Sequence, residues 1–378
     1  MRTGKILCFV AFFLSPFLIL RYKDITISDY LFFFAWILTI NSKGNSSKLN
    51  KKYLLLSMAV IISLILASIF SSDKISSFIV FLKFIVLLIF IPRNIIVYIK
   101  SKQEFVLLLK FYLFGLIIFA AYQVYTYLLN YSNSIYAIPR FSGLAEHVTD
   151  SAGIILVALL LQLVTLNLSN SKYIDILKIS IIITALVVTG SVSAYISATI
   201  GLTVFYLRSS IKGTKRKLSI LIIFASIYFC IYNLINYPIL QRISIATSGR
   251  YDTEYSRILN WQASLNYSTT NVKTLVIGHG LENSANMITS ANGEYLAPHN
   301  MLLLALTSGG IFLTITLSAI LFYTLKTSLR KNKYLNVDFF PLIVAVLLFA
   351  FSSPLIYTRY TWLPIILSNF VNGALGDK

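Results

Sequence analysis

Long apolar runs separated by short polar connections make up most of the chain. A helix of about 20 apolar residues crosses the hydrocarbon core of a bilayer, and short connections are typical of antiparallel neighbouring helices. The pattern predicts an all-α polytopic membrane protein of about 12 transmembrane helices (roughly 10–12), forming a single integral membrane domain over 1–378. The predicted spans lie near 6–20, 27–41, 53–71, 76–92, 105–130, 152–168, 174–190, 192–207, 218–235, 300–325, 339–353 and 359–372.

The composition agrees with this pattern. Hydrophobic residues make up 57% of the chain, charged residues make up 12%, and the mean hydropathy is +0.79. Because a soluble domain carries about 25% charged residues, these values favour a membrane domain over a soluble domain with an anchor. The apolar run after Met1 resembles a signal peptide, but it lacks a small-residue cleavage site and is predicted to be a retained first helix.

The net charge of +19 indicates the orientation of the chain rather than a nucleic-acid partner. With both termini in the cytoplasm, 22 of the 32 lysines and arginines fall on the predicted cytoplasmic side, counting Lys110 and Lys178 near the ends of their spans. Nine fall in the outer segments, and Lys83 lies within a span. This asymmetry follows the positive-inside rule, and the basic inner face suits anionic lipid headgroups. Cys8 and Cys230 each lie within a predicted span, so a structural disulfide between them is not expected.

Two outer loops are longer than the usual connection, a smaller one over 131–151 and a larger one over 236–298. Loops of the second length are usually either functional or disordered. Apolar residues recur at roughly helical spacing in the larger loop, which argues against disorder. The stretch from about Thr253 to Tyr267 is predicted to be an amphipathic helix lying on or near the membrane.

The three histidines of the chain, His147, His279 and His299, all fall on the predicted outer side. His299 stands in the sequence Pro298-His299-Asn300, where the larger loop enters the next span. One interpretation is structural, with His299 or Asn300 capping the helix. The other is functional, because an imidazole held at the membrane boundary can exchange a proton near neutral pH.

The larger loop also carries Arg242, Arg250 and Arg257. Arginine presents a planar set of donors that binds phosphate or carboxylate through two hydrogen bonds. A lipid-linked phosphate is one candidate ligand, and pairing with the neighbouring Asp252 and Glu254 is the alternative. Those two carboxylates lie between arginines, which lowers their affinity for a metal ion, and no metal or other cofactor is predicted.

From Arg257 onward, the order of short motifs resembles the shared domain of O-antigen ligases and O-antigen (Wzy-type) polysaccharide polymerases. The family pattern is Arg-x-x-x-Trp, then a Gly-x-Gly turn, then a His-Asn pair opening a helix that contains a glycine step. The matching segments are Arg257-Ile258-Leu259-Asn260-Trp261, Gly278-His279-Gly280, Pro298-His299-Asn300 and Ser308-Gly309-Gly310-Ile311, with weaker upstream matches at Arg140-Phe141-Ser142-Gly143 and Val188-Thr189-Gly190-Ser191.

The chain departs from the family pattern at two places. Family members often carry an arginine where this chain has Val192, and a glycine directly before the loop arginine where it has Ser256. Gly249 precedes Arg250 instead, so either Arg250 or Arg257 is the family's key arginine, and the spacing to Trp261 favours Arg257. Arg140 and Arg359 are candidates to supply the missing outer cation.

The resemblance implies a fold like that of the GT-C lipid-dependent glycosyltransferases, and a metal-independent, inverting glycosyl transfer from an undecaprenyl-diphosphate-linked donor. In that interpretation Arg257 and His299 are catalytic. Arg257 stabilises the departing diphosphate and His299 receives or orients the proton of the acceptor hydroxyl. Residues expected to bind the diphosphate or the glycan are Arg140, Arg250, Trp261, Asn300 and Arg359.

The acceptor stays open at this point. The Gly-x-Gly turn before His299 and the missing arginine at Val192 favour a polymerase, which joins lipid-linked repeat units. The alternatives are a ligase that transfers glycan to lipid A core, and a lipid-linked oligosaccharide flippase or other transporter. Expected partners are the lipid-linked donor and acceptor, membrane lipids, and other polysaccharide-assembly proteins such as a chain-length regulator or a flippase. The expected location is the bacterial inner membrane, with the active site facing the periplasm.

Overall fold

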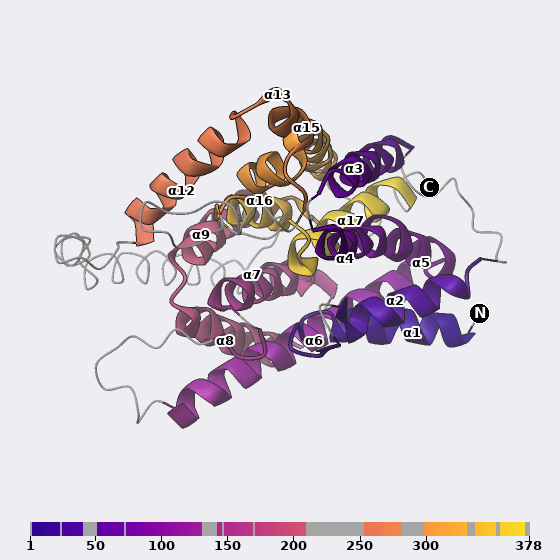
Figure 1. The fold of residues 1–378 in the computed structure, drawn as a ribbon. Coiled ribbons are helices and arrows are strands. Elements are labelled where there is room, and N and C mark those ends of the chain that lie inside the picture. Colours follow the sequence, from indigo (N-terminus) through magenta and orange to yellow (C-terminus); the bar gives the residue numbers. More distant parts are fainter. Residues whose placement is uncertain are drawn as a thin grey trace.

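The computed structural model describes residues 2–22, 25–40, 51–71, 73–130, 142–145, 147–168, 171–208, 253–281, 298–330, 337–352 and 356–374 (Figure 1). Most of these residues are helical. The α-helices are α1 (Arg2–Leu14), α2 (Ile27–Ile37), α3 (Lys51–Ile69), α4 (Lys74–Ile85), α5 (Ile91–Tyr98), α6 (Lys102–Asn130), α7 (Val148–Val164), α8 (Lys172–Thr189), α9 (Val192–Arg208), α12 (Thr253–Ser268), α13 (Val272–Ile277), α15 (Met301–Ser328), α16 (Phe340–Ala350) and α17 (Arg359–Ala374).

Every predicted span except 218–235, which lies outside the described residues, coincides with helix in the structure. A π-helical turn, Val86–Phe90, joins α4 and α5 into one apolar rod. In the described part of the chain, four helical stretches are long and apolar enough to cross a membrane: Lys51–Ile69, Lys74–Tyr98, Lys102–Leu129 and Met301–Ser328. Shorter apolar helices accompany them, so the chain has the helical character of a membrane-embedded protein.

The helices α7 and α17 form the centre of the bundle (Figure 1). Every residue of α7 from Asp150 to Val164 is buried, and so is the run 358–371 that contains most of α17. α7 packs against α6, α8, α9, α16 and α17, so it has neighbours on all sides. A helix that is apolar all round, as α7 nearly is, reaches this degree of burial only when other helices surround it.

One small departure from an all-helical fold follows α1. Residues Arg21–Tyr22 (β1) and Ile25–Thr26 (β2) pair as a two-stranded antiparallel ribbon. The ribbon leads into α2, whose N-terminus is closed by a capping box between Thr26 and Asp29. The prediction of an all-helical fold is therefore correct apart from this ribbon. Its strands are two residues long, too short to show a periodic pattern in the sequence.

Contacts between connecting segments join residues that the alternating topology assigns to the same side. On the predicted inner side, Lys5 pairs with Glu104 at 2.5 Å, and Arg208 pairs with Asp338 at 2.9 Å. On the predicted outer side, the backbone N–H of Ile19 donates to Leu144. The start of α1 and the end of α17 also lie at the same end of the bundle (Figure 1), which agrees with the prediction that both termini are on one side.

Candidate functional site

The helix that follows His299 is two helices joined at a break. Within α15, Gly310 has φ of 67° and ψ of −164°, which is not a helical conformation. The segment 301–309 is roughly 13 Å long, and the segment 311–328 is roughly 27 Å long, close to the thickness of a bilayer core. The predicted span near 300–325 is therefore a short helix followed by a longer one.

The break in α15 is where the Gly278-His279-Gly280 segment docks. The backbone N–H of His279 donates to the carbonyl of Thr307, and that of Gly280 donates to the carbonyl of Ser308, both at 2.9 Å. Thr307 and Ser308 lie at the end of the helical segment before the break, so the turn supplies donors to carbonyls that a continuous helix would satisfy itself. The two glycine motifs seen in the sequence are thus the two sides of one contact.

Glycine is required on both sides of this contact. Gly278 has φ of 80°, and a Cβ placed on it would lie 2.4 Å from the carbonyl carbon of Ser308. A Cβ on Gly310 would lie 2.3 Å from the carbonyl oxygen of Val276. Both obstacles are backbone atoms, which cannot rotate away. Gly278 and Gly280 both have positive φ, so the tight turn predicted for this segment is confirmed.

The same turn is held from its other side by the connection between α3 and α4. The backbone N–H of Leu281 donates to the hydroxyl of Ser77 at 3.2 Å, and Ser77 donates to Ser71 at 2.6 Å. Asp73, beside them, caps α4 by accepting from the backbone and the hydroxyl of Ser76, and these hydrogen bonds hold the pKa of its carboxyl below the usual value. The turn is therefore fixed between two transmembrane elements.

His279 stacks on Tyr267 of α12, with the ring centroids 3.8 Å apart and the planes inclined by 21°. Burial lowers the pKa of His279, and a hydrogen bond with the backbone of Tyr267 partly opposes that shift. The folded state thus favours the neutral imidazole. The neutral His279 contributes to the stability of the fold at pH values above the unfolded pKa of about 6.5. This contribution is lost as the pH falls through the lower pKa of His279 in the folded state.

The helix predicted near Thr253–Tyr267 coincides with α12, which lies on one flank of the bundle beside α15 (Figure 1). Its buried face is small and polar: Asn260, Ser264 and Ser268 are at most 2% exposed. The two serine hydroxyls donate back to carbonyls of their own helix, so this face packs without unsatisfied hydroxyl groups.

The apolar residues Ile258, Trp261 and Leu265 of α12 are exposed, at 52%, 38% and 45%. A helix with its polar face on the protein and its apolar face outward suits a membrane surface, as the sequence predicts. Trp261 is therefore accessible to a ligand or a lipid.

The structure separates the roles of His299 and Asn300. Asn300 is the N-cap of α15, and its Oδ1 accepts from the backbone N–H groups of Leu302 at 3.0 Å and Leu303 at 3.2 Å. The helix cap is therefore made by Asn300, and the side chain of His299, which is partly buried, is not needed for it. Pro298, which precedes His299, is buried, and α15 begins two residues after His299. These two neighbours fix the backbone of His299 at the N-terminus of α15.

The structure describes some of the candidate arginines and not others. Arg140 and Arg250 lie outside the described residues. The backbone of Arg257 belongs to α12, one turn before Trp261, and its side chain is outside the described part. An i, i+4 pair shares one face of a helix, so Arg257 and Trp261 lie on the same side of α12.

Arg359 is held inside the protein. It is 7% exposed, its Nη2 lies 3.5 Å from Oδ2 of Asp29, and its Nη1 donates to the hydroxyl of Ser28. Because a buried guanidinium needs a partner, this ion pair between the first turns of α2 and α17 gives Arg359 a structural role. Beside it, Tyr360 donates to Asp150 at the start of α7 at 3.0 Å.

Lys83 is a candidate that the sequence shows only as a lone charge within a span. Its Nζ lies 4.5 Å from the ring centroid of Tyr357, which precedes α17. A lysine within a spanning helix is a functional-site candidate because burying its charge is costly. The cation–π contact places that charge beside the segment that joins α16 to α17 on the predicted outer side.

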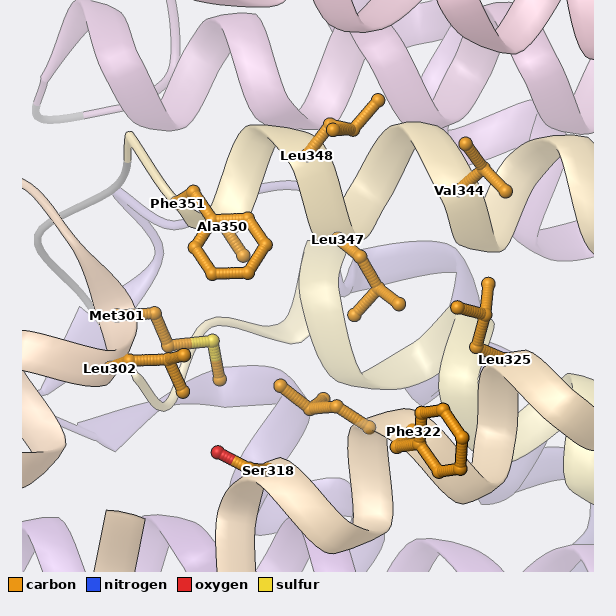
Figure 2. A pocket seen from close by; sticks show the side chains of 11 residues that line it. Met301, Leu302, Ser318, Phe322, Leu325, Val344, Leu347, Leu348, Ala350 and Phe351 are labelled. Atoms are coloured by element: carbon orange, nitrogen blue, oxygen red, sulfur yellow. The ribbon is translucent and has the colours of Figure 1, made fainter. Parts of the chain in front are cut away.

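An apolar groove of about 310 Å³ begins at the first residues after Asn300 (Figure 2). Met301, Leu302 and Phe351 lie at one end, and Leu325 and Val344 lie at the other. The groove is open to the outside of the bundle, since Phe322, Phe351 and Leu348 are at least 36% exposed. Its full lining is Met301, Leu302, Ser318, Leu321, Phe322, Leu325, Val344, Leu347, Leu348, Ala350 and Phe351.

The comparison of the chain with protein-family models and with curated proteins found no match. Among the described residues no group of three or more His, Cys, Asp and Glu side chains is placed to hold a metal ion. Asp252 and the side chain of Glu254 lie outside them. The function is therefore argued from the motif residues and their surroundings.

Proposed function

We propose that the protein is a surface-polysaccharide polymerase of about 12 spans that joins undecaprenyl-diphosphate-linked oligosaccharide repeat units on the periplasmic face of the bacterial inner membrane. The observation that carries the proposal is the ordered set of motifs from Arg257 to Gly310. Its two glycine motifs form a single contact at the end of the short helical segment 301–309 that His299 and Asn300 begin. A site assembled from α12, the Gly278-His279-Gly280 turn and the N-terminus of α15 accounts for all of these motifs together.

The chemistry asks little beyond alignment and charge stabilisation. The oxygen of an acceptor hydroxyl attacks the anomeric carbon of the donor glycan, and the bond from that carbon to the diphosphate oxygen breaks. The hydroxyl proton passes to His299. Undecaprenyl diphosphate leaves with the bonding electrons, and Arg257, assisted by Arg140 or Arg250, stabilises the charge that develops on it.

Attack opposite the leaving group inverts the anomeric centre. The acceptor is the glycan of a second lipid-linked repeat unit, which becomes the new end of the growing chain. Trp261 offers an exposed ring at the membrane surface on which a sugar can stack. Lys83, whose ammonium lies over the ring of Tyr357 on the predicted outer side, is a further candidate to stabilise the charge of the diphosphate.

The groove between α15 and α16 supports a lipid-linked substrate. It starts at Met301, two residues after His299, and continues along α15 to Leu325. Ser318 supplies the one side-chain oxygen among the residues that line it (Figure 2). An isoprenoid chain lying here would have its diphosphate end near the His299 end of the groove. We therefore assign the groove to the undecaprenyl tail.

The function is tested by deleting the gene in the native host and restoring the intact chain on a plasmid. The expected deletion phenotype is lipid A core bearing a single repeat unit, with the full ladder of lengths restored on complementation. Core without any repeat, with polymer stranded on undecaprenyl diphosphate, would instead identify a ligase. Core without any repeat and without polymer would identify a flippase.

Filling the groove should weaken binding of the lipid-linked substrate. Leu347 lies partly buried in the groove lining, and Leu347→Trp places an indole where the tail is expected. Since the tail leaves one apolar environment for another, its gain is packing rather than water exclusion, and we expect the KM for the lipid-linked donor to rise several-fold.

The measurement is the initial rate of polymer formation by the purified protein at a series of donor concentrations. Ile315→Trp is the matched control, because Ile315 is 59% exposed on α15, the other helix of the groove, and does not line the groove. Equal KM values for the two variants would remove the groove from the substrate path.

A further inference from the structure

A second cavity, of about 390 Å³, lies among α6, α7 and α8. This volume is within the range of small-molecule binding sites. The cavity lies near the first turns of α6 and α8 and the last turn of α7, which are the predicted cytoplasmic ends of these helices. Its lining residues precede Arg257 and His299 by many positions in the sequence, and the proposed glycosyl transfer does not use them. Its lining is Val106, Lys110, Leu113, Phe114, Ile117, Gln162, Thr165, Leu168, Ser171, Ile174, Asp175 and Lys178.

Two buried acceptor atoms in this cavity have no donor within the described part of the chain. Gln162 and Asp175 are 1% and 3% exposed, and the amide of Gln162 donates to Oδ1 of Asp175 at 3.1 Å. The other carboxylate oxygen, Oδ2, and the amide oxygen Oε1 of Gln162 receive no hydrogen bond from these residues. A buried acceptor oxygen without a donor is costly, so these two atoms suit a ligand that donates hydrogen bonds and carries positive charge.

The same cavity is lined by two cations. Lys110 is exposed and Lys178 is partly exposed. Lys110 lies eight residues into α6, roughly 12 Å from its start, and Lys178 lies six residues into α8, roughly 9 Å from its start. On the predicted topology, these positions place both lysines near the cytoplasmic membrane boundary, where lysines extend their ammonium groups toward phosphate.

A phosphoethanolamine headgroup carries both complementary charges, an ammonium and a phosphate joined by two methylene groups. We propose that this cavity binds phosphatidylethanolamine from the inner leaflet. Its primary ammonium has three N–H donors and binds Oδ2 of Asp175 and Oε1 of Gln162. Its phosphate lies between Lys110 and Lys178. The acyl chains follow Leu113, Phe114 and Ile117 along α6, and Phe114, which is 57% exposed, marks the open side of the cavity.

Headgroup selectivity tests the proposal on the unmodified protein. The full chain, stripped of lipid in detergent, is titrated with phosphatidylethanolamine, phosphatidylcholine and phosphatidylglycerol of identical acyl chains, and bound lipid is counted by native mass spectrometry. We expect phosphatidylethanolamine to bind about tenfold more tightly than phosphatidylcholine, because a trimethylammonium group cannot donate a hydrogen bond. Equal binding of these two lipids, or tighter binding of phosphatidylglycerol, overturns the proposal.

Variants locate the site. Asp175→Asn should lower the affinity for phosphatidylethanolamine about tenfold and remove its preference over phosphatidylcholine. Lys110→Gln and Lys178→Gln should weaken both lipids alike. Lys326→Gln is the control, since Lys326 lies in the last turn of α15 and does not line the cavity. Binding by the cavity variants that equals binding by Lys326→Gln overturns the assignment. If a variant fails to fold, the headgroup comparison on the unmodified protein still decides.

Discussion

Replacing His299 by alanine should abolish the polymer ladder and leave single repeat units on the lipid A core. In a purified assay we expect the transfer rate to fall roughly 10²–10⁴-fold, the usual contribution of a positioned general base. The fold itself should persist, because the N-cap of α15 is made by Asn300 and does not depend on the imidazole. The helical circular dichroism of the variant should therefore match that of the unmodified protein.

The other two histidines of the chain provide matched controls. His147→Ala changes an exposed residue at the outer end of α7 and should leave the ladder intact. His279→Ala removes a stacking contact with Tyr267 and should lower the thermal stability. The transfer rate of the protein that still folds should fall much less than in His299→Ala. A normal ladder from His299→Ala, or the same loss from His147→Ala, would remove His299 from the mechanism.

Arg257 is the partner residue in the same test. Arg257→Ala should reduce transfer roughly 10²–10³-fold, the effect of removing one donor to a developing negative charge. Arg257→Lys should restore only part of the rate, because an ammonium group lacks the planar pair of donors. A lysine variant with the full rate would indicate that only the charge at this position matters.

Hydropathy predicts the helices of this protein well because burial in a bilayer requires long apolar runs. Apart from 218–235, which the structure does not describe, each predicted span corresponds to a helix in the structure. The assignment of sides from lysine and arginine also agrees with the contacts made by Lys5, Arg208 and Ile19. These features depend on local composition, which the sequence states directly.

The break in α15 is hidden for a different reason. Ser308-Gly309-Gly310 stands within a continuous apolar run, and isolated glycines in such a run are compatible with an unbroken helix. What breaks the helix is the docking of the Gly278-His279-Gly280 turn, and the sequence alone does not give that tertiary contact. The resemblance to a family places both motifs in order but does not say that they touch.

Buried polar pairs are equally hidden. Arg359 is indistinguishable in the sequence from a free outer cation, yet Asp29, more than three hundred residues away, pairs with it. Gln162 and Asp175 belong to neighbouring helices and meet only because α7 and α8 pack side by side. Such pairs follow from helix packing rather than from any local pattern.

The second large effect concerns the glycine contact. Gly310→Ala should destabilise the protein by about 3 kcal/mol or more, because φ of 67° with ψ of −164° is a conformation that essentially only glycine adopts. The new methyl group would also overlap the carbonyl oxygen of Val276, which adds an overpacking cost. The measurement is thermal unfolding in detergent, followed by circular dichroism.

Gly190→Ala is the matched control for backbone strain. Gly190 ends α8 with φ of 60° and ψ of 21°, the left-handed conformation that alanine can adopt at a cost of about 1–2 kcal/mol. A stability loss in Gly310→Ala no larger than that in Gly190→Ala would mean that the break in α15 can straighten without consequence.

The contact between the two glycine motifs makes a sharper prediction when both are changed. Gly278→Ala should cost stability for the same reason as Gly310→Ala, since its methyl group would meet the backbone of Ser308. Either substitution separates the turn from α15, so the second has little left to disrupt. The loss in the double variant should therefore fall short of the sum of the two single losses by more than about 0.5 kcal/mol.

Activity should follow the same rule. If the docked turn holds the mouth of α15, and with it His299, each single glycine variant that still folds should transfer glycan slowly, and the double variant should be no slower. Additive losses of stability together with unchanged transfer rates would show that the turn stabilises the fold without positioning His299.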